Sequence, residues 1–186
     1  MGQLLVILAH PSISDSIANK TIVEGIQQKY PSAEVRDLTA LYPDFKIDVA
    51  AEQQALKSAD TVIFQYPFFW YNMPGILKHW CDEVLTFNFA YGPEGDQLKG
   101  KNFMASFTIG GPQDAYKATG YNHFRIEEFM KPIEQTAHLT QMNYFDPVYT
   151  HGMVYIEGVY NTVEGVTERA QAHLDRLFQQ LDNIQA

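Results

Sequence analysis

Three loops carry the side chains that could take part in chemistry, and each comes directly after an apolar run. The first, residues 10–19, is rich in Ser, Asp and Asn and leads into a helical pattern. These side chains, with the free N–H groups of a helix start, can bind one phosphate, although the same residue types are ordinary helix caps. The loop contains neither a G-x-G-x-x-G fingerprint nor a P-loop, which disfavours a dinucleotide-binding Rossmann domain and a P-loop nucleotidase.

Four consecutive aromatic residues fill the second loop, between Pro67 and Pro74. Adjacent side chains point in different directions, so the core cannot take all four, and some rings must face a cleft or a subunit interface. A planar apolar ligand or a partner chain would cover the exposed rings. A dimer contact without chemistry is the alternative, and the two interpretations agree if the site lies at the interface. The four residues are Phe68, Phe69, Trp70 and Tyr71.

The third loop begins at Thr108 and contains Gly110 and Gly111. Two glycines at a strand end allow the backbone to approach a flat ligand closely and to adopt positive φ. Tyr116 and His123 follow the loop, and either can supply a proton or polarise a carbonyl, since histidine titrates near neutral pH. A surface histidine without a role is the alternative interpretation of His123.

The remaining titratable residues lack metal-ligand spacing, and no metal is expected. The single cysteine, Cys81, excludes an internal disulfide and a cysteine-rich metal site, which fits a reducing compartment such as the cytoplasm. His79 and His138 lie on expected helices without metal-ligand spacing. Three acidic residues are interpreted as a solvated face or a helix cap: Asp44, Asp48 and Glu52.

The charge balance limits the class of partner. With 13 basic and 22 acidic residues the net charge is -9, which argues against affinity for nucleic acid or anionic lipid, because both depend on basic surface. A phosphorylated ligand would be held largely by backbone N–H groups and a helix dipole.

The N-terminus has the pattern of a strand rather than of a signal peptide, and no apolar run approaches the ~20 residues that span a membrane, so a membrane role requires a partner.

Apolar runs alternate with helical stripes along the chain, and this order predicts an α/β, doubly wound parallel sheet in a single domain, residues 1–186. In the flavodoxin-like strand order 2-1-3-4-5, a ligand binds at the carboxyl ends of the first and third strands. The three loops follow the first, third and fourth expected strands, so we expect them to meet in one site. The expected strands are 4–9, 33–38, 61–66, 103–109 and one within 141–149; the expected helices are 17–30, 49–59, 76–85, 126–137 and 166–181.

The segment from Gln65 to Lys78 resembles the signature of the NAD(P)H:quinone reductase family of flavodoxin-like flavoproteins, and the similarity covers most of residues 4–135. Within that family, residues 41–53 resemble the bacterial oxidoreductases that act as ancillary subunits of glutathione-gated potassium efflux systems. Further segments that carry the similarity are 8–11, 16–19, 89–92 and 108–111.

The resemblance implies a homodimer with a flavin in each of two interface sites. The flavin would be FMN, with FAD as the alternative, and the electron donor NADH or NADPH. The phosphate and ribityl end would be held by His10, Ser16, Ile17 and Asn19. The isoalloxazine would be bordered by Pro67, Phe68, Phe69, Trp70 and Tyr71, and through backbone contacts by Thr108, Gly110 and Gly111. Two aromatic residues, Phe89 and Tyr91, match positions that reach the partner's substrate pocket.

The implied activity is ping-pong transfer of two electrons from NAD(P)H through the flavin to a quinone or similar acceptor. Tyr116 matches the family's tyrosine beside the flavin carbonyl. Mammalian relatives pair that tyrosine with a histidine, whereas direct counting gives Asn122 here, with His123 adjacent, so the identity of the proton-relay residue stays open. Two other functions remain open as well: a regulatory ancillary subunit of a potassium efflux system, and a flavodoxin-like electron carrier.

Overall fold

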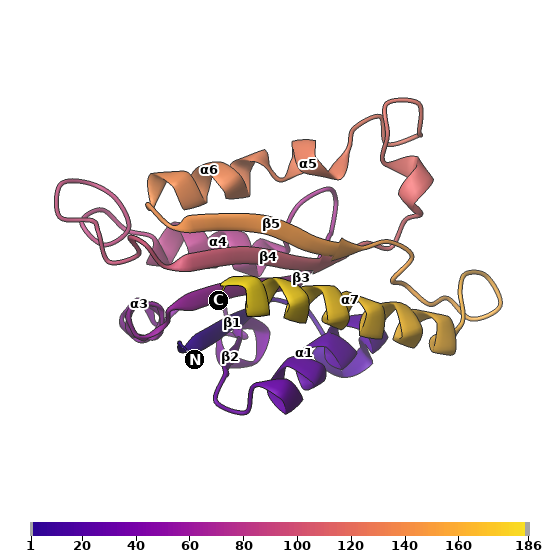
Figure 1. The fold of residues 1–186 in the computed structure, drawn as a ribbon, viewed down its shortest axis with the longest axis horizontal. Helices are drawn as coiled ribbons and strands as arrows, with labels where there is room; N and C mark the ends of the chain where they lie inside the picture. Colours follow the sequence, from indigo (N-terminus) through magenta and orange to yellow (C-terminus); the bar gives the residue numbers. More distant parts are fainter. Residues whose placement is uncertain (1, 185–186) are drawn as a thin grey trace.

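The computed structural model of the protein describes residues 2–184. Five parallel strands form one sheet in the order β2-β1-β3-β4-β5 (Figure 1), which confirms the doubly wound, flavodoxin-like arrangement predicted from the sequence. The strands are β1 (Leu4–Leu8), β2 (Glu34–Asp37), β3 (Thr61–Pro67), β4 (Asn102–Thr108) and β5 (Asn143–Thr150).

The central strands are apolar because helices cover both faces of the sheet. Every residue of β1 and β3 is buried, and the two strands pair in register, with Val6 beside Ile63. Burial on both faces removes the alternation of apolar and polar residues that a half-exposed strand shows. This explains why β1 appears in the sequence as an uninterrupted apolar run and why β3 departs from one only at Thr61 and Gln65.

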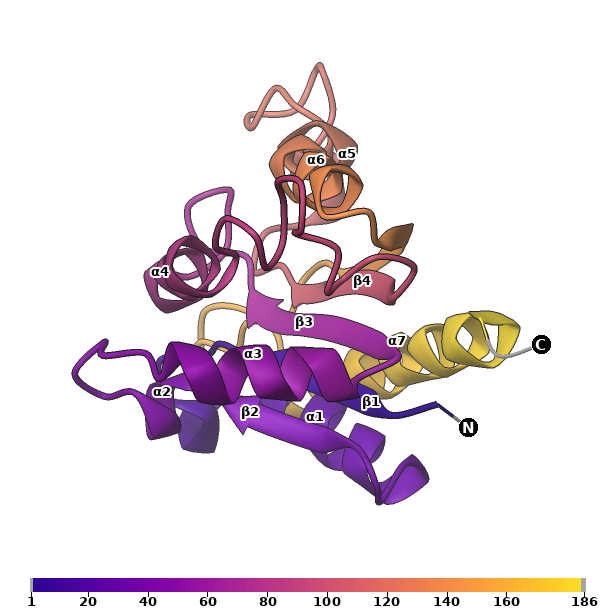
Figure 2. The ribbon, with the colours of Figure 1, turned by 90° about the vertical axis from the view of Figure 1, so that its left-hand side faces the viewer.

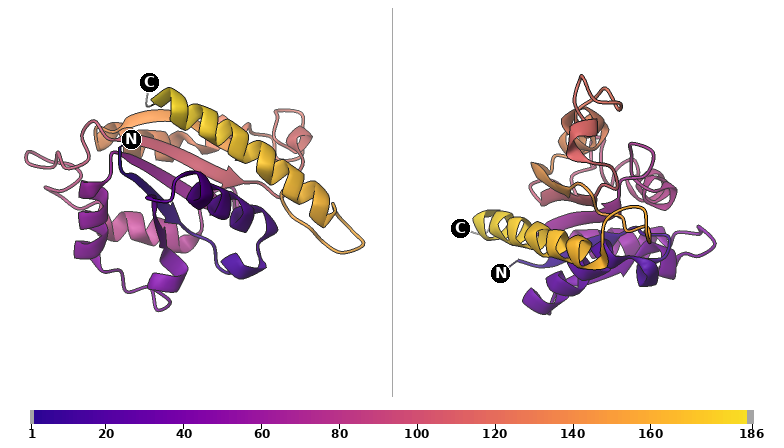
Figure 3. Two further views of the ribbon diagram at one scale, coloured as in Figure 1. Left: turned by 60° about the horizontal axis from the view of Figure 1, so that its bottom comes forward. Right: turned by 90° about the vertical axis from the view of Figure 1, so that its right-hand side faces the viewer.

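One face of the sheet is covered by α1 and α7, and the other by α3, α4 and α6 (Figures 2 and 3). Gly25 allows α1 to approach α7 closely, because a Cβ there would lie 2.3 Å from a methyl carbon of Leu174. The helices are α1 (Ile17–Lys29), α2 (Leu38–Leu41), α3 (Val49–Ser58), α4 (Gly75–Val84), α5 (Ile126–Phe129), α6 (Lys131–Leu139) and α7 (Val163–Ile184), with short 3-10 turns at Ile13–Asp15 and Gln113–Ala115.

Two helices differ from the sequence prediction. The single helix expected over 126–137 is two, α5 and α6, which meet at Met130. Pro132 lacks an N–H group and is accommodated in the first turn of a helix, so a new helix begins there. The short helix α2 was not predicted; the carboxylate of Asp37 caps it by accepting two backbone N–H groups.

The prediction that Glu52 faces solvent is wrong. Glu52 lies on α3 with its side chain fully buried, and its carboxylate accepts hydrogen bonds from Arg36 Nε at 2.7 Å, Tyr42 Oη at 2.5 Å and Trp80 Nε1 at 2.8 Å. Three donors from other elements offset the cost of burying the carboxylate. Asp48 does cap α3, as expected, because its side chain accepts a backbone N–H.

None of the helices within residues 2–184 combines the length and the apolar character needed to cross a membrane.

Candidate active site

A cavity of about 460 Å³ lies at the carboxyl ends of the strands, within the range of about 300 to 1,000 Å³ that small-molecule sites occupy. The loops after β1, β3 and β4 meet there, as the strand order predicted, and the loop after β5 completes the wall. In Figure 1 these loops extend beyond the right-hand end of the sheet. Eleven residues that the sequence singled out line the cavity: His10, Ser16, Ile17, Asn19, Pro67, Phe68, Phe69, Thr108, Gly110, Gly111 and Tyr116.

Five further residues line the cavity, and three of them come from the loop after β5. Sequence reasoning missed these three because the last third of the chain showed only a general similarity to the family. Their position just after a strand of the sheet is the signal that could have found them, since ligands bind beyond the carboxyl ends of such strands. The five residues are Ser12, Asp15, Met153, Val154 and Tyr155.

The polar end of the cavity is built around Asn19 at the start of α1. Ser16 is the N-cap of the helix, and its hydroxyl accepts the backbone N–H of Asn19 at 3.0 Å. The Asn19 side-chain amide donates to Ser16 Oγ at 3.3 Å and to Thr108 Oγ1 at 3.0 Å. A hydroxyl that accepts these bonds still has its own hydrogen to donate, so Ser16 and Thr108 can both donate to a ligand oxygen.

His10 is a third donor in the cavity lining, and its ring lies 6.5 Å from that of Phe69, centroid to centroid. The backbone N–H of Ser12 donates to His10 Nδ1 at 3.1 Å, so the proton of the neutral imidazole is on Nε2. Burial lowers the pKa of His10 below its usual value, which keeps the ring neutral at pH 7. No Lys or Arg is among the lining residues; hydroxyl, imidazole and backbone N–H groups are therefore the donors that an anionic group would meet here.

The glycines after β4 keep the cavity wall flat. Neither Gly110 nor Gly111 has positive φ, so that part of the sequence argument for them was wrong. A Cβ on Gly110 would lie 3.6 Å from Val154, and one on Gly111 would lie 3.4 Å from the Tyr116 ring. Both neighbours line the cavity, so a side chain at either glycine would fill space that a ligand needs.

The aromatic loop divides between the core and the surface. Phe68 is buried, whereas Phe69, Trp70 and Tyr71 are exposed, Trp70 by 91%; the prediction that the core cannot take all four rings is confirmed. Trp70 and Tyr71 do not line the cavity. Both have positive φ, 48° and 65°, a conformation that non-glycine residues adopt at an energetic cost and that is common at binding sites.

Trp70 and Tyr71 contact other surfaces instead. Trp70 lines a neighbouring hollow of about 500 Å³, together with Phe45 and Met73. The Tyr71 hydroxyl donates to Asn122 Oδ1 at 3.1 Å, and its ring stacks on Phe129 with 5.4 Å between the ring centroids. The positive φ at both positions turns these two side chains away from the cavity that Phe68 and Phe69 line.

Tyr116 is paired with a histidine that the sequence did not indicate. The ring of His151 lies 5.2 Å from that of Tyr116, centroid to centroid. His151 Nδ1 is 3.2 Å from the carbonyl oxygen of Gly111, and since a carbonyl only accepts, Nδ1 carries the proton. Burial raises the pKa of Tyr116 and lowers that of His151, so at pH 7 Tyr116 keeps its proton and His151 is neutral.

His123 lies apart from this pair. Its side chain is exposed, its backbone φ is 62°, and it does not line the cavity. The catalytic role that the sequence analysis gave to His123 stays a prediction, and the structure does not bring the residue to Tyr116.

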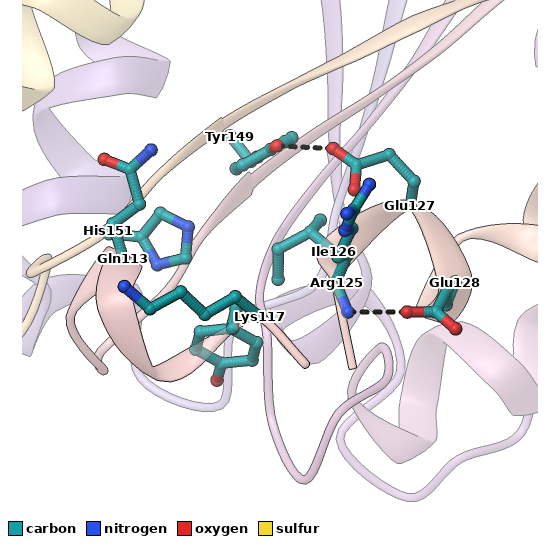
Figure 4. Close-up of a pocket in the computed structure, with 9 residues that line it drawn as sticks. Gln113, Lys117, Arg125, Ile126, Glu127, Glu128, Tyr149 and His151 are labelled. Atoms are coloured by element: carbon teal, nitrogen blue, oxygen red, sulfur yellow. Dashed lines mark hydrogen bonds between the residues drawn. The ribbon is translucent and has the colours of Figure 1, made fainter. Parts of the chain in front are cut away.

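A second hollow, of about 690 Å³, adjoins the cavity across Tyr116. Figure 4 shows His151 and Lys117 on one side of it and Arg125 and Glu127 on the other. Tyr149 at the end of β5 donates to Glu127 Oε1 at 2.9 Å, which ties the edge of the sheet to α5. The Tyr116–His151 pair therefore stands between the cavity and a polar, solvent-open space.

Phe89 and Tyr91 lie at the other end of the sheet. Their loop connects α4 to β4 and packs beside the amino ends of the strands, at the far left of Figure 1. Phe89 is buried and Tyr91 is 40% exposed, and neither lines the cavity of its own protomer. Their predicted place in a substrate pocket therefore requires a second copy of the chain.

Among residues 2–184, no group of three or more His, Cys, Asp or Glu side chains is arranged to hold a metal ion.

Comparison with known proteins identifies the family. The chain matches a family described as having a flavodoxin-like fold over residues 2–176. It is 45% identical over 140 residues to the Bacillus subtilis protein named "uncharacterized NAD(P)H oxidoreductase YdeQ", covering 75% of this chain and 71% of the relative. It is 40% identical over 146 residues to the glutathione-regulated potassium-efflux system ancillary protein KefG of Yersinia enterocolitica, covering 78% and 79%.

A solved structure agrees with these matches. General stress protein 14 of Treponema denticola, crystallised in complex with FMN, superposes with a TM-score of 0.84 at 36% identity and covers 95% of this chain and 98% of that one. The family match, the relatives and the strand order all lead to the same assignment. The chain belongs to the flavodoxin-like family, and it is an oxidoreductase of that family.

Proposed function

We propose that the protein is a flavin-dependent NAD(P)H oxidoreductase that passes two electrons, by ping-pong hydride transfer, to a quinone or a similar planar acceptor. The observation that carries the proposal is the cavity itself, whose lining combines three hydrogen-bond donors with glycine and aromatic residues. Bound flavin would supply the hydride chemistry, because it accepts a hydride from a nicotinamide and returns two electrons to the acceptor.

FMN is the proposed flavin. The Ser16 and Thr108 hydroxyls are joined through the Asn19 amide at the N-terminus of α1, a donor set that suits a single terminal phosphate, and the His10 imidazole lines the same cavity. FMN bound to the Treponema denticola relative supports the same choice. The proposed electron donor is NADH or NADPH.

An absorption spectrum of the purified protein tests the proposal. We expect added FMN to bind with the spectral shift of a bound flavin, and anaerobic NADH or NADPH to bleach it. FAD provides the comparison for the flavin, and the two nicotinamides compete for the donor role. Failure of both flavins to bind would overturn the enzyme proposal, and one-electron exchange without nicotinamide turnover would favour the electron carrier.

Tyr116 is the residue that we expect to take part in the reaction as a proton or hydrogen-bond donor. Its hydroxyl stays protonated at neutral pH, since burial raises the pKa of Tyr116, and so it can donate a hydrogen bond or a proton at the cavity wall. His151 packs against the same ring and faces the solvent-open hollow of Figure 4, which makes it a second candidate, beside His123, for the residue that returns the proton.

A homodimer is part of the proposal. Trp70, Phe45 and Phe69 are exposed around the neighbouring hollow, and an exposed aromatic patch of this kind fits a subunit interface. Neither Phe89 nor Tyr91 lines the cavity of its own protomer, which fits a pocket shared between two copies.

Trp70→Ala tests the interface. Because the ring is 91% exposed, we expect the free energy of unfolding of the protomer to change by less than about 0.5 kcal/mol. We expect the dimer to weaken by about 2 kcal/mol, about 30-fold in dissociation constant, because a buried tryptophan is a typical interface anchor. Analytical ultracentrifugation measures the change, with Leu139→Ala, another exposed apolar site, as the control. Equal dimerisation of both variants would remove Trp70 from the interface.

A second candidate function is favoured by the likeness to the potassium-efflux ancillary protein. In that role the chain would be a cytoplasmic subunit that binds a membrane transporter, and its oxidoreductase activity would accompany or serve the regulation. Co-purification with a potassium efflux transporter from the same cell, and a change in efflux on deletion, test it. Unchanged efflux in the deletion strain would count against regulation without affecting the proposed enzyme.

A further inference from the structure

A continuous chain of buried polar side chains runs from the cavity wall, across the sheet, to α7. It begins at Asn19 and Thr108 in the wall and passes through His173, which is fully buried on the helix that covers the sheet, to Thr150 and Arg176. All five inner members are at least 95% buried: Asn19, Gln65, Ser106, Thr108 and His173. A buried polar network of this extent is costly unless every group is paired, so its pairing determines how each group is oriented.

The bond from Ser106 to Gln65 fixes the direction of donation, whereas Thr150 at the outer end can still either donate or accept. Arg176 Nη2, which only donates, donates to Thr150 Oγ1 at 2.6 Å. The single hydroxyl hydrogen of Ser106 goes to Gln65 Oε1 at 2.5 Å. His173 Nε2 lies 2.8 Å from Ser106 Oγ, so Nε2 must supply the hydrogen of that bond.

The rest of the histidine follows from this assignment. A neutral imidazole has one N–H, so Nδ1 of His173 accepts from the Thr150 hydroxyl, 2.9 Å away. Burial lowers the pKa of His173 to about 3, in agreement with a ring that stays neutral. His173 thus receives a hydrogen bond on its outer side and donates one on its inner side.

At the inner end, the same direction of donation orients the Asn19 amide in the cavity wall. Gln65 Nε2 donates to Asn19 Oδ1 at 2.9 Å, which turns the Asn19 amide nitrogen toward two hydroxyls. That nitrogen donates to Ser16 Oγ at 3.3 Å and Thr108 Oγ1 at 3.0 Å. In the part of the chain that the structure describes, neither hydroxyl hydrogen has a recorded acceptor, and both residues line the cavity.

We propose that His173 is a positioning residue for the cofactor cavity: by donating through Nε2 it sets the direction of the hydrogen-bond chain and makes the Ser16 and Thr108 hydroxyls donors toward a ligand phosphate. This inference rests on the proposed function. If every bond of the chain ran in the opposite direction, the Asn19 carbonyl oxygen would face both hydroxyls. The Ser16 and Thr108 hydroxyls would then donate their hydrogens to that oxygen and present only lone pairs to the cavity. A phosphate only accepts hydrogen bonds, so the observed direction favours FMN over riboflavin, which ends in a hydroxyl.

Two substitutions at His173 test the proposal by rescue. His173→Leu removes both bonds, and we expect it to weaken FMN binding about tenfold or more while changing riboflavin binding less than threefold, because hydrogen bonds to a charged group are the stronger ones. His173→Gln keeps one donor and one acceptor, and we expect FMN affinity within about threefold of the parent protein. Quenching of flavin fluorescence measures both dissociation constants.

Thr108→Val and Thr108→Ser extend the test to the other end of the chain. Serine keeps the hydroxyl and should keep FMN affinity, whereas valine should reproduce the selective loss of His173→Leu. This pair stands in for His173→Leu if that variant does not fold. Equal weakening of FMN and riboflavin by the apolar variants, or no weakening of FMN, would overturn the proposal.

The tautomer of His173 gives a readout that a packing role would not produce. We expect ¹⁵N NMR of the full-length protein to show His173 with a protonated Nε2 and an unprotonated Nδ1, the signal being assigned by its loss in His173→Gln. A protonated Nδ1 would refute the direction of donation. If the parent protein binds FMN but His173 is protonated on Nδ1, this inference alone is wrong. If the parent protein binds no flavin, the proposed function is wrong.

Discussion

Tyr116→Phe is expected to lower kcat about 100-fold while the affinity for FMN stays unchanged. A hydroxyl that donates a proton or a hydrogen bond in the reaction contributes about 100-fold or more to the rate. No hydrogen bond of the Tyr116 hydroxyl to the other described residues is recorded, and its ring packs on Phe68, Phe129 and His151. Phenylalanine keeps that packing, so only the proton or hydrogen-bond donor is lost.

Anaerobic stopped-flow reduction by NAD(P)H, with steady-state turnover of a quinone, measures the effect, and the FMN dissociation constant is the control. Unchanged kinetics in the variant would remove the hydroxyl from the reaction. A fall in FMN affinity to the same extent would show that the residue acts in binding instead.

The same assay separates the two histidines. His151→Asn is the informative change, since His151 contacts both Tyr116 and the Gly111 carbonyl at the cavity wall. His123→Asn is the matched control, an exposed histidine outside the cavity. If His151 serves Tyr116, its substitution lowers kcat and shifts the pH profile, whereas His123→Asn leaves both unchanged; the opposite result restores the pairing expected from the sequence.

Glu52→Ala is expected to lower the free energy of unfolding by about 3 to 5 kcal/mol. The carboxylate is fully buried and pairs with Arg36, whose side chain is 17% exposed. Hydrogen bonding to Glu52 raises the pKa of Arg36, and the guanidinium stays charged when the carboxylate is removed. The variant therefore leaves a nearly buried cation with less compensation and two further donors, from Tyr42 and Trp80, unpaired.

Urea unfolding of the apoprotein measures this loss. The double variant Arg36→Leu with Glu52→Leu is the control, because replacing both partners by apolar side chains removes the unpaired charge, and we expect it to be more stable than Glu52→Ala. A cost of less than about 1 kcal/mol for Glu52→Ala would mean that the carboxylate contributes little to stability. A double variant as unstable as the single one would place the cost in lost packing.

Local pattern was enough to predict the order of elements and the position of the site. An uninterrupted apolar run such as Leu4–Leu8 identified a strand covered on both faces, and the alternation of strands and helices limited the topology to a doubly wound sheet. Since the carboxyl ends of parallel strands lie at one edge, the loops after β1, β3 and β4 had to meet. The sequence placed thirteen residues of the site in those loops or at Tyr116. Eleven of them line the cavity, and only Trp70 and Tyr71 turn away from it.

Other features depended on contacts between distant segments, which no local pattern contains. Glu52 has the sequence context of a surface residue, and its burial is decided by donors from β2, the loop after α2, and α4. Trp70 leaves the cavity because of the backbone conformation of its loop. His151 reaches Tyr116 only because β5 pairs with β4 at the edge of the sheet.

The helix that carries His173 follows from local pattern, whereas the role of His173 depends on contacts between distant segments. The sequence analysis did not single His173 out, although its position on α7 falls on the same helical face as Ala170 and Leu177. The sequence determined only the helix and its apolar stripe. Only the tertiary structure decided what His173 would do, because its partners Ser106 and Thr150 come from two strands that are adjacent in the sheet but separated along the chain.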